Sequence, residues 1–214
     1  MKIGILGGSF NPVHNGHLRL AIEAQELIGL DRVDLVPAAV PPHKASVHML
    51  SFDFRLILLR LAVTSCSQIL VNDLEGSRPG PSYTVDTLRA YKNIYPEDDF
   101  YFLLGSQDLM TLPSWREWKT LISLTNLVVV WRNGSDMDEL DKFVQSHLPQ
   151  AKQVLSSCLV WSLPFDKQII TLQIPLLEIS STLVRNKWQQ GLSLSYLVPE
   201  AVEKALKEYK PNEL

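Results

Sequence analysis

The stretch GGSFNPVHNGH, residues 7–17, decides the fold predicted for this chain. It follows a short apolar run, MKIGIL, and precedes the helical pattern LRLAIEAQELIGL. Residues 2–6 lack the alternation of a half-exposed strand, which indicates a strand buried on both faces, as in a parallel sheet. Residues 17–29 repeat apolar positions at helical spacing, and Gly29 is placed as a C-cap. The sequence therefore predicts a glycine-rich turn from a buried strand into a helix.

Strands and helices continue to alternate along the rest of the chain. Further strands are predicted at residues 33–36, 68–72, 100–105, 127–131, 158–161 and 168–173. Further helices are predicted at 53–65, from Ser82 through YTVDTLRAYKNIY, at 136–147, and in the runs ISSTLVRNKWQQG and PEAVEKALKEY. Alternation at this spacing is typical of βαβ units. We expect an α/β fold with a Rossmann-like, doubly wound parallel sheet. No repeat, low-complexity tract or linker interrupts it, so one domain over residues 1–214 is expected.

Composition excludes several classes of protein. The formal net charge is −3, whereas a protein that coats nucleic acid usually shows a basic excess. The longest apolar runs, such as LVVVW at 127–131, are far too short to span a bilayer. The N-terminus lacks the zones of a signal peptide, since a glycine-rich turn begins at residue 7. We therefore expect a cytoplasmic protein with no nucleic-acid partner and no membrane, and homo-oligomer formation stays open.

The turn at 7–17 lies where an open α/β sheet binds its ligands, outside the carboxyl ends of the strands. Glycines there let the backbone approach a ligand, and the following helix offers free N–H groups that favour anions. Three common motifs do not match. A Walker loop needs GK[ST], a dinucleotide fingerprint needs GxGxxG, and a zinc helix usually carries HExxH. Taken alone, His14 and His17 could also be a helix cap and a packed surface imidazole.

A second stretch, ISSTLVR at 179–185, adds to the anion-binding character. Ser180 is a natural N-cap, and Ser181 and Thr182 fall in the first turn of the helix. Arg185 is three residues beyond Thr182, so the two side chains can face the same way. Hydroxyls, free N–H groups and a guanidinium then converge as in a phosphate site. The alternative is a plain capped helix with a surface arginine.

A third stretch, PAAVPPHK at 37–44, follows the second predicted strand and so reaches the same edge of the sheet. Its prolines stiffen the loop, and Lys44 extends a cation from it. A rigid connector is the alternative interpretation. Three elements that can bind anions are thus expected at one edge of the sheet. Their combination favours a phosphate site over a chance arrangement.

These motifs resemble a known family. The first stretch resembles the (T/H)xGH signature of the nucleotidyltransferase superfamily, and ISSTLVR resembles its second signature. Within that group the chain resembles the bacterial nicotinate-nucleotide adenylyltransferases over nearly its whole length. The more specific matches are RPGPSYTVDTL at 78–88 and LLGSQDLMTLPSW at 103–115. The resemblance implies transfer of AMP from ATP to nicotinate mononucleotide, which gives deamido-NAD and pyrophosphate in NAD biosynthesis.

The resemblance also implies roles for residues. The catalytic residues would be His14, His17, Lys44 and Arg185. The ATP-binding residues would be Gly7, Gly8, Ser9, Phe10, His14, His17, Gly105, Ile179, Ser180, Ser181, Thr182 and Arg185. In this type of reaction catalysis is mostly positioning plus electrostatics, because the attacking phosphate is already ionised. Mg²⁺ would bridge phosphate oxygens of ATP, with no protein-bound metal and no covalent intermediate.

The resemblance places the mononucleotide against a second set of residues: Lys44, Ser82, Tyr83, Thr84, Gln107, Asp108, Trp115 and Arg116. Trp115 would stack on the nicotinate ring, and backbone N–H groups near Thr84 and Arg116 would receive its carboxylate. Without the resemblance, Trp115 and Trp118 would be taken for core residues of a helix.

The chain departs from the family pattern at three places. Gln107 stands where an acidic residue usually helps hold a ribose, and Asp108 follows it. Asn11 replaces a commoner Asp, and Ala38 and Ala39 stand where an Asn is common.

Two alternatives share the signatures: a transferase acting on phosphopantetheine, and a nucleotide-binding sensor without turnover. A dehydrogenase on a similar sheet lacks its fingerprint.

Overall fold

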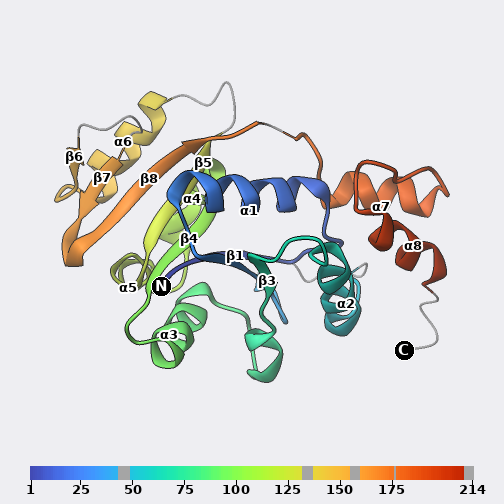
Figure 1. The fold of residues 1–214 in the computed structure, drawn as a ribbon. Helices are drawn as coiled ribbons and strands as arrows, with labels where there is room; N and C mark the ends of the chain where they lie inside the picture. Colours follow the sequence, from blue (N-terminus) through green and yellow to red (C-terminus); the bar gives the residue numbers. More distant parts are fainter. Residues whose placement is uncertain (43–48, 132–136, 155–159, 176, 210–214) are drawn as a thin grey trace.

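The computed structural model describes residues 1–42, 49–131, 137–154, 160–175 and 177–209 (Figure 1). The strands are β1 (Lys2–Gly8), β2 (Arg32–Pro37), β3 (Ile69–Val71), β4 (Asp99–Gly105), β5 (Asn126–Trp131), β6 (Lys152–Val154), β7 (Val160–Leu163) and β8 (Lys167–Gln173). The α-helices are α1 (Asn15–Ile28), α2 (Phe52–Ala62), α3 (Thr84–Ile94), α4 (Ser106–Thr111), α5 (Trp118–Leu124), α6 (Met137–His147), α7 (Ser181–Gln189) and α8 (Glu200–Glu208). Short 3₁₀ turns are η1 (Leu74–Ser77), η2 (Leu112–Ser114) and η3 (Pro164–Asp166).

All these strands join one sheet in the order β3-β2-β1-β4-β5-β8-β7-β6. The six strands from β3 to β8 run parallel, as the sequence predicts. The predicted doubly wound parallel sheet is therefore confirmed, and the sequence did not predict the far edge, where β7 pairs antiparallel with both β8 and β6. Only the short turn η3 separates β7 from β8, and so short a connection can join antiparallel neighbours but not parallel ones.

The core lies in two layers, one on each face of the sheet. Helices α1, α2, α7 and α8 contribute to one layer, and α3, α4, α5 and α6 to the other. Strand β5 shows how one strand serves both layers: Val128 and Val130 face the first, while Leu127 and Val129 face the second. A strand buried on both faces reads as a continuous apolar run, which explains LVVVW.

The connections fix where a ligand can bind. From β1 the chain moves outward to β2 and β3, and then returns to place β4 on the opposite side of β1 (Figure 1). Neighbouring connections therefore leave β1 and β4 toward opposite faces, and a crevice opens outside the carboxyl ends of these strands. The turn at 7–17 lies at this crevice.

Several predicted boundaries shift in the structure. The helix predicted from Ser82 begins at Thr84, with Tyr83 in extended conformation as its N-cap. Helix α1 ends as predicted, since Gly29 adopts the left-handed conformation with φ 68°. The sequence pattern missed α4, α5 and β6 because each has seven residues or fewer, too few to show a period.

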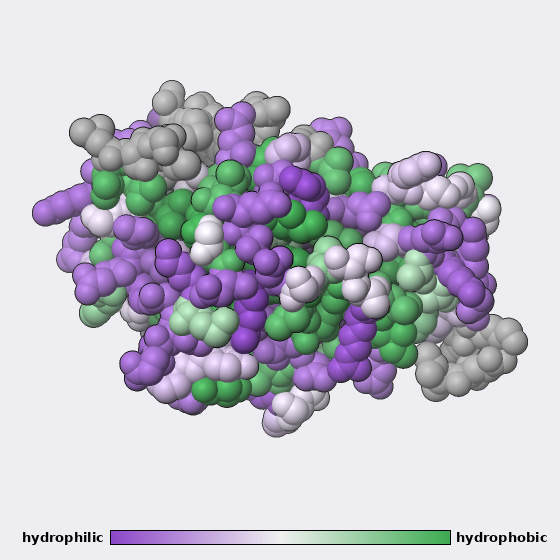
Figure 2. Space-filling view, in the orientation of Figure 1, coloured by the Kyte–Doolittle hydropathy of each residue, from purple (hydrophilic) through white to green (hydrophobic). Residues whose placement is uncertain are grey.

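Hydrophilic and hydrophobic residues are interspersed over the face that Figure 2 shows. Within the described residues, each helix is too short or too polar to cross a lipid bilayer.

Candidate active site

A cavity of about 230 Å³ opens at the carboxyl edge of the parallel strands. It gathers residues that the sequence analysis assigned to two different ligands. These residues are Gly7, Gly8, Ser9, Ser82, Tyr83, Thr84, Trp115 and Arg116. Phe102 and Val36, from β4 and β2, complete its apolar part. The structure therefore brings the glycine-rich turn, the start of α3 and the Trp115 segment around one space.

The two histidines of the turn stack face to face, and neither is among the residues that line the cavity. The ring centroids of His14 and His17 lie 3.6 Å apart. His14 is buried, and burial lowers the pKa of its imidazole to about 4, so the ring is neutral at pH 7. Its Nδ1 is buried without a hydrogen-bond partner. A buried polar atom in that state is uncommon and is expected where a ligand group belongs.

The backbone of the turn fixes the orientation of His17. The N–H of His14 donates to Nδ1 of His17 at 3.2 Å, so in the neutral ring the proton is on Nε2. Phe10 packs edge-on against the same ring, with centroids 4.9 Å apart. A Cβ on Gly16 would lie 3.0 Å from Nδ1 of His14, so only glycine leaves the stacked pair undisturbed. His17 is thus held as a preorganised hydrogen-bond donor.

Phe10 itself adopts a left-handed backbone conformation, with φ 43°. For a bulky aromatic residue this conformation is strained and persists only where the surroundings hold it, typically at a functional site. The surroundings here are the core, since Phe10 is almost completely buried. Sequence reasoning gave no sign of this strain.

The second motif contacts the first directly, although more than 160 residues separate them in the chain. Ser180 caps α7 by accepting from the N–H of Leu183, as predicted. The hydroxyl of Ser181 donates to the carbonyl of Pro12 at 2.9 Å. Arg185 donates to the carbonyl of Asn11 at 2.7 Å and to the hydroxyl of Thr182 at 3.1 Å. The arginine and the first turn of α7 therefore lie beside the histidine turn, which the plain surface-arginine alternative does not predict.

The opposite wall of the cavity combines a helix start with an aromatic ring. The hydroxyl of Ser82 accepts from the N–H of Val40, which ties the start of α3 to the loop after β2. Trp115 follows η2, is partly exposed and stands edge-on to Phe102 at 6.1 Å. Trp115 therefore lines the cavity, whereas Trp118 lies at the start of α5 and lines a separate groove.

Thr84 and Arg116, which line this wall, each carry a backbone N–H group. The N–H of Thr84 is in the first turn of α3, where no intrahelical acceptor exists. Within the described residues, neither this N–H nor that of Arg116 meets an acceptor. Both groups can therefore donate to a bound anion.

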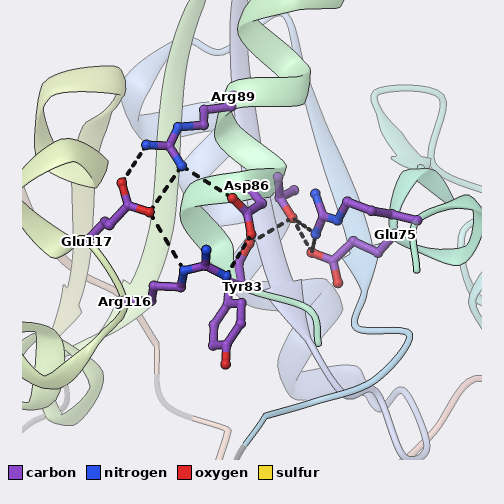
Figure 3. Close-up of polar contacts among 8 residues, drawn as sticks. Glu75, Tyr83, Asp86, Arg89, Arg116 and Glu117 are labelled. Atoms are coloured by element: carbon purple, nitrogen blue, oxygen red, sulfur yellow. Dashed lines mark hydrogen bonds and ion pairs between the residues drawn. The ribbon is translucent and has the colours of Figure 1, made fainter. Parts of the chain in front are cut away.

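A cluster of four charged side chains joins the two sides of this wall (Figure 3). Asp86 and Arg89 come from α3, and Arg116 and Glu117 come from the segment after Trp115. The guanidinium of Arg116 also lies over the ring of Tyr83, 4.7 Å from its centroid. We refer to Asp86, Arg89, Arg116 and Glu117 as the charge cluster.

Arg55 is a site residue that sequence reasoning did not identify. Its side chain is 1% exposed. It donates to the backbone carbonyls of Ser9 at 2.6 Å, Leu50 at 3.1 Å and Ala39 at 3.5 Å. One buried guanidinium thus holds the loops that follow β1 and β2. In the sequence, the sign of this role is an arginine within an otherwise apolar helix.

Glu75 is a second residue that sequence reasoning missed. It lines the cavity from η1. Its Oε1 accepts from the hydroxyl of Thr87 and lies 3.8 Å from a guanidinium nitrogen of Arg78, while Oε2 is buried without a partner. The cavity therefore contains an acidic group as well as backbone donors.

The remaining predicted site residues lie apart from the cavity or outside the described residues. Gly105 ends β4, and Asp108 in the first turn of α4 lies beside it, within 3.5 Å of where a Cβ on Gly105 would be. Gln107 is exposed on the same helix. Ile179 precedes the cap of α7. Lys44 lies outside the described residues.

Comparison with known proteins gives consistent results. The cytidylyltransferase-like family model matches residues 5–187. A protein of Citrifermentans bemidjiense named "Probable nicotinate-nucleotide adenylyltransferase" is 42% identical over 217 residues, with 98% of this chain and 97% of the relative covered. A protein of the same name from Geobacter sulfurreducens is 40% identical, with the same coverage of both chains.

Two solved structures share the fold. Both are of the Plasmodium falciparum nicotinic acid mononucleotide adenylyltransferase, one complexed with NaAD and one with APC. Their TM-scores are 0.74 and 0.72, at 21% and 20% identity. Each alignment covers 97% of this chain and 95% of the other.

Proposed function

Because this chain belongs to the cytidylyltransferase-like family, and within it to the nicotinate-nucleotide adenylyltransferases, we propose that it transfers AMP from ATP to nicotinate mononucleotide. The products are deamido-NAD and pyrophosphate, which makes the reaction a step of NAD biosynthesis. The single nucleotidyltransferase domain proposed for residues 1–214 is supported by the one continuous sheet. A cytoplasmic location fits an enzyme that draws on cellular ATP.

The observation that carries the proposal is the direct contact between the two motifs. Arg185 and Ser181 bond to the carbonyls of Asn11 and Pro12, inside the turn that holds His14 and His17. These contacts hold together the groups of both motifs: imidazole donors, a guanidinium, hydroxyls and two helix N-termini. Such a set suits a polyphosphate that must be bent and stabilised as charge develops on it.

In the proposed mechanism the phosphate of nicotinate mononucleotide attacks the α-phosphorus of ATP, and pyrophosphate leaves. His17 donates a hydrogen bond from Nε2 to phosphate oxygens. The neutral ring of His14 stacks on His17 and donates a hydrogen bond to phosphate oxygens as well. Lys44, Thr182 and Arg185 are assigned to the β- and γ-phosphates. The first turn of α7 provides backbone N–H groups to the same anion.

Mg²⁺ is proposed to enter with ATP as part of the substrate. The described residues contain no group of three or more histidine, cysteine or acidic side chains that could hold a metal ion. Phosphate oxygens are the ligands that Mg²⁺ prefers, and it retains water in such complexes. The ion offsets negative charge on the phosphates, while the protein residues orient them.

The mononucleotide is assigned to the cavity. The indole of Trp115 provides a flat surface for the pyridine ring, and the N–H groups of Thr84 and Arg116 receive its carboxylate. Ser82 and Tyr83 line the same wall. Gln107 and Asp108 at the start of α4 are assigned to the ribose, with Asp108 the stronger acceptor of its hydroxyl protons.

Release of pyrophosphate tests the proposal. The purified protein is incubated with ATP and Mg²⁺, and nicotinate mononucleotide, nicotinamide mononucleotide or phosphopantetheine is added in turn. We expect release with nicotinate mononucleotide and formation of deamido-NAD in equal amount. Turnover of phosphopantetheine alone would assign the protein to another branch of the superfamily, and binding of ATP without any turnover would make it a nucleotide sensor.

Replacing Arg185 tests the phosphate site. Arg185→Ala removes a charged donor beside the helix start, and we expect kcat/KM for ATP to fall about tenfold, as for loss of one charge-assisted hydrogen bond. Arg185→Lys keeps the charge but loses the planar fork, so an intermediate value is expected. Lys187→Ala removes a cation from the same helix and is the matched control. Normal use of ATP by Arg185→Ala would reduce the second motif to a helix cap.

A further inference from the structure

The charge cluster connects two segments of the chain that contribute residues to the cavity. On one side is the first part of α3, whose start carries the N–H of Thr84. On the other side is the segment that carries Trp115 and Arg116. In Figure 3 the four charged side chains lie between these two ribbons, and dashed contacts connect them.

The contacts form a closed set of alternating charge. Arg89 bonds to both carboxylate oxygens of Glu117, at 3.3 and 2.5 Å, and to Asp86 at 3.3 Å. Arg116 in turn lies 3.6 Å from Asp86 and 3.7 Å from Glu117. Two cations and two anions thus balance one another. A bidentate arginine–carboxylate pair in a network holds geometry better than an isolated surface pair.

The backbone at Glu117 shows that the segment is held in place. Glu117 has φ 49° and ψ 40°, a left-handed conformation that is strained for a non-glycine residue. The chain adopts it directly before α5, and so turns the Glu117 carboxylate toward Arg89. The ion pair with Arg89 also keeps the pKa of Glu117 below its ordinary value.

We propose that Arg89 and Glu117 are positioning residues that fix the distance between Trp115 and the start of α3, and so the width of the slot for the pyridine ring. This inference rests on the proposed function. Neither residue lines the cavity, whereas Trp115, Arg116 and Thr84 do. Their effect on the substrate is therefore indirect, through the segment between Trp115 and Glu117. Residues that act on the ATP site, such as His17 and Arg185, lie on other elements.

The test compares the two substrates in Arg89→Ala. We expect KM for nicotinate mononucleotide to rise about threefold to tenfold. KM for ATP and kcat should change less than twofold. Arg89→Lys keeps a single-point ion pair and should recover part of the loss. Glu117→Gln is nearly isosteric and should show the same selective rise in KM if Arg89→Ala does not fold. In a double-mutant cycle, Arg89→Ala with Glu117→Gln should cost little more than either change alone, because both remove one contact.

The control is Arg60→Ala on α2, which breaks an exposed arginine pair with Asp73 at 3.1 Å and does not line the cavity. It should leave both KM values unchanged, and thermal melting should show similar midpoints for all variants. An unchanged KM for the mononucleotide in Arg89→Ala and Glu117→Gln would overturn the inference, and so would an equal rise in both KM values. An inactive unmodified protein would instead contradict the proposed function.

Discussion

The His17→Ala protein is expected to turn over about a hundredfold more slowly than the unmodified protein, with less than a tenfold change in KM for ATP. His17 is a donor fixed before the substrate arrives: its Nδ1 is occupied by the N–H of His14, and its ring lies between His14 and Phe10. Such a donor costs no reorganisation when charge develops on the phosphates. Loss of one preorganised donor typically lowers kcat by about 10²–10³-fold.

Two companion variants separate catalysis from folding. Gln at position 17 can still accept the N–H of His14, as in a capping box, so His17→Gln should keep the helix start but lose the imidazole donor. His147→Ala removes another stacked histidine, 4.7 Å from Phe143 at the end of α6, and should leave the rate unchanged. Steady-state kinetics measure kcat and KM of each variant, and thermal melting shows whether the variant is folded. A near-normal kcat in His17→Ala would assign the residue to structure alone.

Nicotinate mononucleotide should be preferred over nicotinamide mononucleotide by at least about a hundredfold in kcat/KM. A carboxylate accepts hydrogen bonds with both oxygens, which suits the N–H groups of Thr84 and Arg116 and the positive end of α3. The amide offers one acceptor and an NH₂ that would face a donor. The one buried donor left unpaired costs about 1–3 kcal/mol, and the upper part of that range corresponds to roughly a hundredfold.

Glu75 is the group in the cavity that would oppose this preference. Its unpaired Oε2 could accept the NH₂ of the amide, although Thr87 and Arg78 partly offset its charge. Parallel kinetics with the two mononucleotides decide which group faces the ring. Equal use would show that Glu75, and not the start of α3, meets the substituent. Trp115→Ala should weaken both substrates alike, because stacking does not distinguish a carboxylate from an amide.

The sequence by itself determined the parallel part of the fold and the chemistry of two motifs. Buried parallel strands are continuous apolar runs, and helices of three turns show their period, so β1, β4, β5 and α1 could be read from local pattern. Ser180 as a cap and Gly29 at a helix end follow from backbone rules that act within a few residues. The resemblance to the adenylyltransferases added the role of Trp115, which residue type alone would have assigned to a core.

Only the tertiary structure decided how these pieces meet. The bonds from Ser181 and Arg185 to the turn at Asn11 and Pro12 depend on a chain that returns after some 170 residues. The buried bonds of Arg55 to Ser9 and Ala39, and the place of Glu75 in the cavity beside Gly7 and Trp115, likewise depend on neighbours that are distant in sequence. The depressed pKa of His14 arises from burial by the assembled core, and no pattern of nearby residues encodes it. Local propensity acts over a few residues, whereas burial, charge pairing and cavity shape are properties of the packed chain.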